Sequence, residues 1–290
     1  MYYTHKSIFW FVKPNSSFNF ALNYLLRLQI TQGGIMNRVV LCIKWGDLYP
    51  TAYVNLLFRA VTDNMSNAFE FICLTDDPEG LDVGIKSFPI PEFGLTKERF
   101  KAGLWPKLSI FKPNLYDLDG RCLFIDLDSM IVGDLEPLFQ IKGDLVMIGG
   151  GRVWKHPKKK LKPEALSGVF SFDFGRQSEI FETFCFDREN AYENFENDTV
   201  FIEKYGQNIT FWPDDLIVSF KRHLCQPFGK AFFLKPMHPK ESTLIVAFHG
   251  DPRPIDVVRH KGPLWTNFPR FIRMPVTWVN DYWAKYGYFT

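Results

Sequence analysis

The segment that decides the fold reads Arg121-Cys122-Leu123-Phe124-Ile125-Asp126-Leu127-Asp128-Ser129-Met130-Ile131-Val132. An apolar run ends in two carboxylates, and a second apolar run follows. The first run is long enough for a buried strand and too short for a helix of its own. Because side chains alternate across a strand, Asp126 and Asp128 are expected to point the same way at the strand's end. Ligand sites in open α/β sheets lie at the carboxyl ends of strands, so the segment predicts a site there.

Two carboxylates at this spacing repel each other unless a positive group lies between them. The simplest such group is a divalent cation that prefers oxygen ligands, Mg²⁺ or Mn²⁺. We therefore predict that Asp126 and Asp128 hold a metal ion. The alternative is that both aspartates cap the following turn, which is a common role of this residue type.

Strand-like and helix-like segments alternate along the chain. Alternation of this kind predicts βαβ units and an α/β fold with a mixed, mostly parallel sheet flanked by helices. Strands are expected at residues 39–43, 69–74, 84–88, 145–148 and 165–173, and helices at 53–61, 104–111, 178–186 and from Pro213 onward.

The central segment continues Gly133-Asp134-Leu135-Glu136-Pro137-Leu138-Phe139. Taken together, residues 123–139 resemble the Asp-x-Asp segment of GT-A fold glycosyltransferases, above all the family-8-like enzymes. In that family the pair holds a metal on the diphosphate of a nucleotide-sugar. The resemblance implies a single GT-A (Rossmann-like) domain over residues 36–290. Its nucleotide-sugar-binding half would be 36–150 and its acceptor-side half 151–290. Residues 1–35 would be an N-terminal extension of uncertain order.

The ends of the first two strands are the expected nucleotide site. Trp45, Asp47, Tyr49 and Tyr53 follow the first strand, and Asp76 follows the second. An aromatic ring can stack on uracil while a carboxylate accepts its N–H, and in the family this segment contacts the nucleoside. The alternatives are a turn whose aromatics pack inward and, for Asp76, an ordinary turn residue before Pro78.

Two cationic residues and a histidine complete the expected donor site. Lys107 precedes the metal strand, where relatives often carry a basic residue facing the donor; a solvated helix lysine is the alternative. The segment Phe248-His249-Gly250-Asp251-Pro252-Arg253-Pro254 resembles the family's late His-x-x-Gly-x-x-Lys-Pro motif, with shorter His–Gly spacing and Arg253 in the Lys place. The resemblance implies that His249 binds the metal and Arg253 meets the diphosphate. A structural histidine is the alternative.

The acceptor side carries a weaker match. Residues 165–173 resemble the family's Asn-Ser-Gly-Val strand, but Ala165-Leu166 replace the usual Asn. Residues 211–218 resemble its Asp-Gln helix start near the reacting sugar, which makes Asp214 and Asp215 catalytic candidates. Both can equally be helix caps after Pro213. The family implies retention of anomeric configuration, whereas an inverting enzyme would need a carboxylate base such as one of these two.

The resemblance thus implies a metal-dependent hexosyltransferase that uses a UDP-sugar and a glycan or lipid-linked acceptor, as in polysaccharide biosynthesis. One alternative is a haloacid-dehalogenase-like phosphatase, although Met130 stands where that motif wants Thr or Val. Another is a non-catalytic nucleotide-sugar-binding protein. A chain of 290 residues with net charge +2 lacks the dominant basic character of a dedicated nucleic-acid binder.

Cysteine usage and hydropathy bear on the compartment. The five cysteines are scattered and form no Cys-x-x-Cys pair, so we expect no disulfide framework and a cytoplasmic location. No apolar run approaches the roughly 20 residues that span a bilayer. The basic run at 154–160 and the aromatic, basic tail at 265–288 are compatible with peripheral membrane contact, although packing of the tail against the main domain is the alternative.

Overall fold

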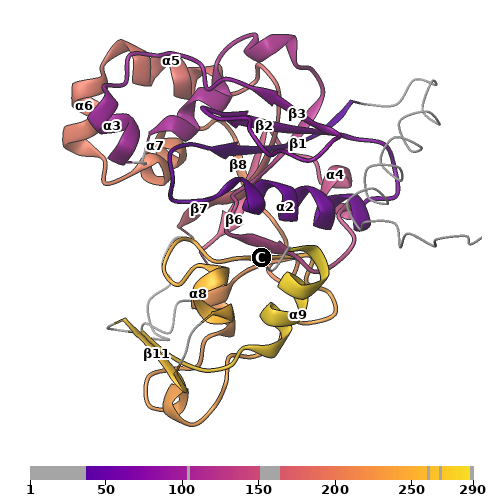
Figure 1. Cartoon of the computed structure of the whole chain (residues 1–290). Coiled ribbons are helices and arrows are strands. Elements are labelled where there is room, and N and C mark those ends of the chain that lie inside the picture. Colours follow the sequence, from indigo (N-terminus) through magenta and orange to yellow (C-terminus); the bar gives the residue numbers. More distant parts are fainter. Residues whose placement is uncertain (1–36, 103–104, 151–163, 260–261, 268–269, 288–290) are drawn as a thin grey trace, which may run out of the picture.

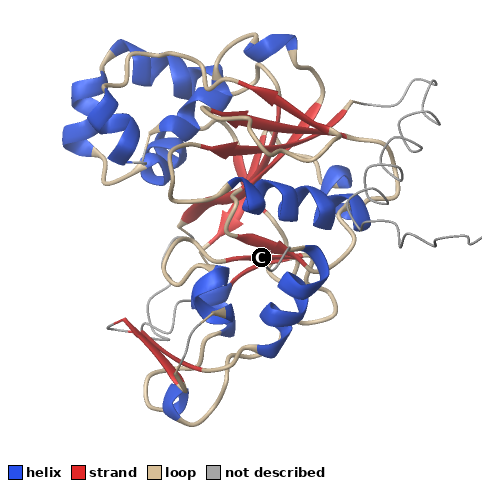
Figure 2. Cartoon of the chain, viewed as in Figure 1, coloured by secondary structure: helices blue, strands red, loops and turns tan. Residues whose placement is uncertain are grey.

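The computed structural model of the chain describes residues 37–102, 105–150, 164–259, 262–267 and 270–287 (Figures 1 and 2). The expected N-terminal extension and the basic run at 154–160 lie outside the described residues. A seven-stranded sheet with the order β3-β2-β1-β4-β7-β6-β8 forms the centre. Its strands are β1 (Arg38–Lys44), β2 (Glu70–Thr75), β3 (Ile85–Phe88), β4 (Arg121–Ile125), β6 (Leu145–Gly149), β7 (Ala165–Asp173) and β8 (Ile209–Phe211).

Most strands of this sheet run in one direction. β3, β2, β1 and β4 pair in parallel, and β8 is parallel to β6. Only β7 is reversed, because it pairs antiparallel with both β4 and β6. The sequence-based prediction of a mixed, mostly parallel sheet is therefore confirmed, and so is each strand that it placed at 39–43, 69–74, 84–88, 145–148 and 165–173.

Period-two alternation along β1 divides the core into two layers. Val39, Leu41 and Ile43 face one cluster of buried side chains, and Val40 and Cys42 face the other. The first layer packs under η1 (Pro106–Phe111), α5 (Ser178–Phe186) and α7 (Asp198–Tyr205), and the second under α2 (Thr51–Asp63) and α9 (Thr277–Tyr286). Figure 2 shows helices on both sides of the sheet. Further helices are α3 (Lys97–Ala102), η2 (Leu115–Asp117), α4 (Glu136–Gln140) and α6 (Arg188–Asn194).

A smaller sheet with the order β5-β10-β9 joins the C-terminal part of the chain to the Asp-x-Asp segment. β5 (Ser129–Ile131) directly follows Asp128 and pairs antiparallel with β10 (Ile245–Ala247), which is parallel to β9 (Ile217–Ser219). The remaining elements are η3 (Phe220–Leu224), η4 (Lys230–Phe232), α8 (Pro254–Val258) and the hairpin β11 (Leu264–Asn267) with β12 (Arg270–Arg273).

The C-terminal helix α9 packs on the main domain. Its Tyr282, Trp283 and Tyr286 are buried, and the Tyr282 hydroxyl accepts a hydrogen bond from the Ile131 amide. For α9, packing against the main domain is therefore what the structure shows. No helix in the described parts of the chain is both long and apolar enough to cross a membrane.

One helix prediction was incomplete, one was wrong, and other helices were not predicted. Residues 104–111 were expected to form one helix, but Pro106–Phe111 is a 3-10 helix that ends before Pro113. Pro213 does not open a helix: a turn leads into β9, because Ile217 and Val218 pair with β10 and sheet pairing overrides the local pattern. The helices α6 and α7 were not predicted. Asn197 marks the start of α7, where its side chain accepts the Val200 N–H.

Candidate functional site

A cavity of about 670 Å³ lies where β1, β2 and β4 end. The carboxyl ends of parallel strands meet at one edge of a sheet, which is where ligands of open α/β folds bind. Four residues predicted to contact the nucleotide line this cavity, namely Trp45, Asp47, Tyr49 and Asp76. Lys107, Asp126 and Asp128 line it as well. The structure thus brings together most of the predicted donor site.

The two aspartates of the central segment face the cavity from a tight turn after β4. The Asp126 amide donates to the Gly168 carbonyl at 2.8 Å, and its carbonyl accepts from Ser129 at 3.0 Å. Asp128 is buried, and its Oδ2 accepts the Gly250 N–H at 2.6 Å. Neither side chain caps the following turn, since Asp128 accepts from Gly250 in the loop after β10 and the Asp126 carboxylate accepts from Lys107. The capping alternative therefore does not describe this site.

Lys107 is a buried counter-ion rather than a solvated lysine. Its Nζ lies 2.8 Å from Oδ2 of Asp126 and 3.6 Å from Oδ2 of Asp198, and it also donates to the Ser167 carbonyl at 3.3 Å. Burial by itself lowers the pKa of Lys107, but the carboxylates of Asp126 and Asp198 more than offset this and raise it above its usual range. Lys107 therefore carries a permanent positive charge inside the site.

The charges of the site do not balance. Burial raises the pKa of Asp126 to about 7, with Asp128 adding to the rise and Lys107 opposing it. Burial likewise raises the pKa of Asp128 and of Asp198. Lys107 is in ion-pair contact with only two of these three carboxylates, Asp126 and Asp198, and each of the three would be stabilised by more positive charge. This arrangement favours a cation.

His249 lies next to this cluster in an unusual backbone conformation. Its φ is 56°, in the left-handed region, and its ring rests on Gly168, where a Cβ would lie 2.8 Å from Cε1 and Nδ1. Within the described residues, the buried Nε2 atom has no hydrogen-bond partner. Burial, together with the positive charge of Lys221, lowers the pKa of His249 to about 3, so the ring is neutral at physiological pH. A neutral imidazole with an unused buried nitrogen is able to bind a metal.

The donor set fits Mg²⁺ or Mn²⁺ in its chemistry. Two carboxylates face one cavity, and the Gly250 N–H ties the His249 loop to Asp128. Over the described ranges, no three His, Cys, Asp or Glu side chains are already grouped as a metal cage. Such ions are usually held by one or two carboxylates together with substrate phosphates, so a preformed cage is not required. Asp126 and Asp128 are the residues that would hold the ion.

Arg253 and Tyr53 are near the cavity but do not line it. Arg253 Nη1 donates to the Leu48 carbonyl on the rim at 3.2 Å, while Nε and Nη2 bind Asp256 at 3.2 Å. Tyr53 is buried and packs edge-on against Tyr49, with ring centroids 5.1 Å apart. The alternative that this aromatic packs inward therefore holds for Tyr53, which supports Tyr49 from behind.

The structure does not bring Asp214 and Asp215 to the cavity. Both are exposed in the turn between β8 and β9, and Asp215 forms a surface ion pair with Lys240 at 2.8 Å. Sequence reasoning missed Asp198 instead, a buried carboxylate that lines the cavity at the start of α7. The helix cap at Asn197 was the available signal. It places a helix start there but does not say that the helix reaches the cavity.

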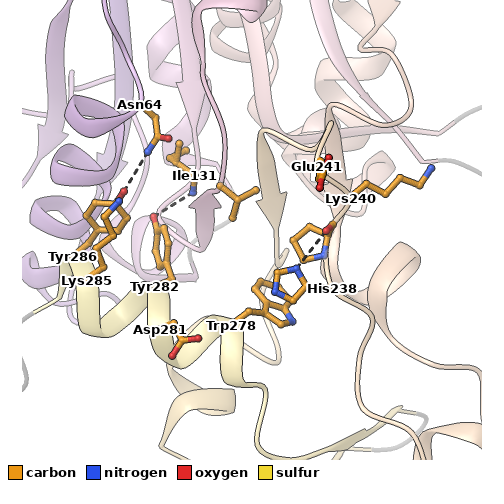
Figure 3. A pocket seen from close by; sticks show the side chains of 12 residues that line it. Asn64, Ile131, His238, Lys240, Glu241, Trp278, Asp281, Tyr282, Lys285 and Tyr286 are labelled. Atoms are coloured by element: carbon orange, nitrogen blue, oxygen red, sulfur yellow. Dashed lines mark hydrogen bonds between the residues drawn. The ribbon is translucent and has the colours of Figure 1, made fainter.

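A second cavity of about 490 Å³ lies between the end of α2, β5 and α9 (Figure 3). Figure 3 shows Trp278 and His238 side by side on one wall and Asn64 on the other. Two of its lysines are already paired with carboxylates, Lys285 with Asp63 and Lys240 with Asp215. Its own carboxylates, Glu241 and Asp281, lie apart from each other, whereas three carboxylates surround Lys107 in the first cavity, which we take as the candidate active site.

Comparison with known proteins places the fold. No protein-family model matches the chain, and no curated protein matches it. Among solved structures, the galactosyltransferase LgtC aligns with a TM-score of 0.52 and 14% identity, covering 74% of this chain and 89% of LgtC. The glycosyltransferase GlyE of Streptococcus pneumoniae aligns with a TM-score of 0.50 and 14% identity, covering 87% of this chain and 65% of GlyE. The bifunctional glycosyltransferase WbbM aligns with a TM-score of 0.50 and 12% identity, covering 76% of this chain and 47% of WbbM.

At these identities the likeness concerns the fold. The chain has the GT-A-like fold of these glycosyltransferases, as its central segment predicted. Membership of family 8 and the division into a donor half and an acceptor half at residue 150 stay predictions. β7 and β8, which follow that point in the chain, are part of the same central sheet.

Proposed function

We propose that this protein is a metal-dependent glycosyltransferase that transfers a sugar from a nucleotide-diphosphate sugar to a glycan or lipid-linked acceptor. A UDP-sugar is the proposed donor and Mn²⁺ or Mg²⁺ the proposed ion. The observation that carries the proposal is that Asp126 and Asp128 face the same cavity as Trp45 and Asp47. The GT-A-like fold supports it independently.

The cavity suits a nucleotide at its β1 end. Its volume of about 670 Å³ is in the range of small-molecule sites. Trp45 is half-buried and offers a ring for stacking on the base, while the exposed carboxylate of Asp47 can accept the uracil N–H. Asp76 has a supporting part, because its Oδ2 accepts the Gly46 N–H at 2.9 Å and thereby fixes the loop that carries both residues.

The leaving group of the reaction is a nucleoside diphosphate. A divalent ion supplies Lewis-acid neutralisation of its developing charge. Asp126 and Asp128 would hold the ion, and His249 is the nearby candidate for a further ligand. Lys107 fixes the Asp126 carboxylate by its 2.8 Å contact. Arg253 lies under the rim at Leu48, and we propose that it adds positive charge on the diphosphate side.

At the sugar end, Asp198 is the better catalytic candidate than Asp214 or Asp215. It lines the cavity and lies 3.6 Å from Lys107, whereas the other two lie on the surface. An inverting mechanism would use it as the base for the acceptor hydroxyl. In a retaining mechanism, which the family resemblance implies, it would position the donor sugar through Lys107.

The two alternatives differ in measurable products. A phosphatase would use Asp126 as a nucleophile and would pass through an aspartyl-phosphate. A non-catalytic binding protein would bind donor without turning it over. We therefore propose a screen of UDP-sugars with Mn²⁺ that measures UDP release with and without acceptors.

Donor binding is measured in parallel by thermal shift. UDP should raise the melting temperature much more with Mn²⁺ than with EDTA, because a ligand of the native state stabilises it by mass action. Equal shifts in both buffers would exclude a metal that bridges the nucleotide. Binding without UDP release from any donor would support the binding protein, and a trapped aspartyl-phosphate would support the phosphatase.

A further inference from the structure

Four large apolar side chains are exposed to solvent in and around η4, in the C-terminal part of the chain that follows β9, which we call the C-terminal lobe. Phe233 is 80% exposed, Phe228 72%, Leu234 51% and Met237 41%. We call these four residues the apolar tip. Single exposed apolar residues are ordinary, but a group of them on one short segment marks an interaction surface.

The backbone of the apolar tip is ordered, so its exposure is part of the fold. The amides of Phe233 and Leu234 both donate to the Lys230 carbonyl, at 3.0 and 2.8 Å. The Met237 amide donates to the Leu224 carbonyl at 2.7 Å. Three of the four exposed side chains therefore start from a hydrogen-bonded backbone, which holds them in position for a partner.

A layer of rings beneath the apolar tip joins it to the β11–β12 hairpin. The rings of Phe232 and Phe271 lie 4.8 Å apart, and Phe228 lies 5.5 Å from Phe271. Arg273 on β12 donates to the Phe232 carbonyl at 3.0 Å. Figure 1 shows this hairpin at the end of the molecule away from the seven-stranded sheet.

The two segments that meet here have a one-sided charge. Residues 216–240 and 257–280 contain nine Lys and Arg and no Asp or Glu. The rest of the chain, with 25 Lys and Arg against 32 Asp and Glu, is net negative. Lys230, Lys235 and Arg273 are exposed beside the apolar tip, and no ion pair joins any of them to a carboxylate within the described ranges.

We propose that the apolar tip is a docking site for an anionic lipid bilayer. Apolar side chains that stand out between lysines and arginines fit such a surface, because they enter the interface while the cations meet lipid phosphates. A second copy of this chain would present the same positive charge and be repelled. Leu234 and Met237 offer a nucleic acid neither a stacking ring nor a charge, so the lipid surface fits this chemistry better.

The proposed docking has a consequence for the active site. The same lobe carries Arg253, whose guanidinium contacts the rim of the donor cavity at Leu48. Docking through the apolar tip would therefore bring the protein to the surface in which lipid-linked acceptors are found. This consequence rests on the proposed function, whereas vesicle binding itself does not.

The experiment is flotation of the full chain with vesicles of neutral lipid alone or of neutral lipid mixed with phosphatidylserine, an anionic lipid of the cytoplasmic leaflet. The protein should float with the anionic vesicles only, and raised salt should weaken binding because it screens the charges. Phe233→Ser with Leu234→Ser should abolish binding. Lys230→Glu with Lys235→Glu should weaken it by at least about tenfold, since each surface cation contributes about fivefold.

Matched variants in the part of the protein around the seven-stranded sheet serve as controls. Phe186→Ser removes an apolar side chain that is 92% exposed, and Lys112→Glu with Lys142→Glu reverses two exposed lysines. Both controls should bind like the unmodified protein, and melting temperatures verify that every variant is folded. The proposal is overturned if the unmodified chain does not float, or if tip and control variants behave alike. It is also overturned if the tip variants change the oligomeric state or nucleic-acid binding rather than vesicle binding. Vesicle binding with no UDP release would leave this proposal standing and count against the glycosyltransferase proposal alone.

Discussion

The Nζ atom of Lys107 lies 2.8 Å from Oδ2 of Asp126, and the lysine is buried where it makes this contact. The lysine balances only part of the charge, since Asp128 and Asp198 are also buried nearby. Lys107 therefore stabilises the site while the ion is absent. The negative charge that it does not compensate can be neutralised by a second cation.

Lys107→Met should destabilise the protein strongly. The substitution leaves buried carboxylates without their counter-ion, which typically costs about 3–5 kcal/mol of unfolding free energy. Lys86→Met is the matched control: Lys86 pairs with Glu70 at 2.7 Å on the surface, where such pairs contribute about 0–1 kcal/mol. Urea denaturation measures both. Similar losses for the two variants would show that Lys107 is not the central counter-ion.

Asp128→Asn should keep the fold and abolish metal-dependent transfer. The amide oxygen can still accept the Gly250 N–H, but the charge that holds the cation is lost. Asp119→Asn is the control, because Asp117-Leu118-Asp119 is a second Asp-x-Asp triplet and Asp119 is exposed. UDP release and the Mn²⁺-dependent thermal shift are measured for both. Unchanged Mn²⁺ dependence in the Asp128 variant would remove the centre of the proposed mechanism.

Mn²⁺-dependent UDP binding should weaken as the pH falls below about 7. Burial raises the pKa of Asp126 to about 7, so a proton competes with the ion below that value and not above it. Affinity should fall by up to about tenfold per pH unit there and level off at higher pH. His249 adds nothing in this window, because its pKa is lowered to about 3. Titration calorimetry at pH 5.5, 6.5, 7.5 and 8.5 measures the effect.

A shifted midpoint would identify the group that titrates. The positive charge of Lys107 lowers the pKa of Asp126, so Lys107→Met should move the midpoint to higher pH. Affinity that is flat from pH 5.5 to 8.5 in the unmodified protein would contradict the assignment of Asp126.

The donor side of the site was predictable because it depends on strand ends. Hydrophobic runs located β1, β2 and β4, and parallel strands bring Trp45, Asp76 and Asp126 to one edge of the sheet. β4 pairs with both β1 and β7, and this pairing places the Asp-x-Asp turn at the same edge. No further sequence signal is needed to predict its position.

The sugar side was not predictable by the same reasoning. Asp198 reaches the cavity because α7 packs beside β7 and η1, and that packing is not visible in local sequence. Pro213-Asp214-Asp215 satisfies the pattern of a helix start and of a turn equally well, and pairing of β9 with β10 decides for the turn. The burial of Lys107 likewise depends on where η1 lies rather than on its own sequence.

Arg253→Ala should lower transfer without changing acceptor affinity. If its cation acts on the leaving group, about 2–4 kcal/mol of transition-state stabilisation should be lost, as for other removed charge-stabilising donors. Arg253→Lys should recover part of this, since a point charge still reaches the phosphates. Excess Mn²⁺ should rescue neither variant. A full rescue by metal, or full activity of the alanine variant, would show that Arg253 has only a structural role, in connecting Asp256 to the Leu48 carbonyl.

Gly168→Ala should weaken Mn²⁺ binding through His249. A Cβ at this position would lie 2.8 Å from the Cε1 and Nδ1 atoms of the His249 ring, so the ring must move. If the ring binds the ion, Gly168→Ala and His249→Ala should each lower the apparent Mn²⁺ affinity on the order of tenfold, the effect of losing about one hydrogen-bond-sized interaction. Excess Mn²⁺ should partly restore turnover in both. Gly149→Ala is the control, because its Cβ would make ordinary contacts at 3.6 Å with Phe211.

The double variant separates this effect from a general disturbance of the turn. Gly168 also accepts the Asp126 N–H, so the alanine could act on Asp126 instead. If it acts only through the ring, Gly168→Ala should cost no additional affinity once His249 is alanine, because the two changes then remove one and the same interaction. Additive losses would instead locate the effect of Gly168→Ala at Asp126, and an unchanged Mn²⁺ affinity of the His249→Ala variant alone would show that its ring has no part in holding the ion.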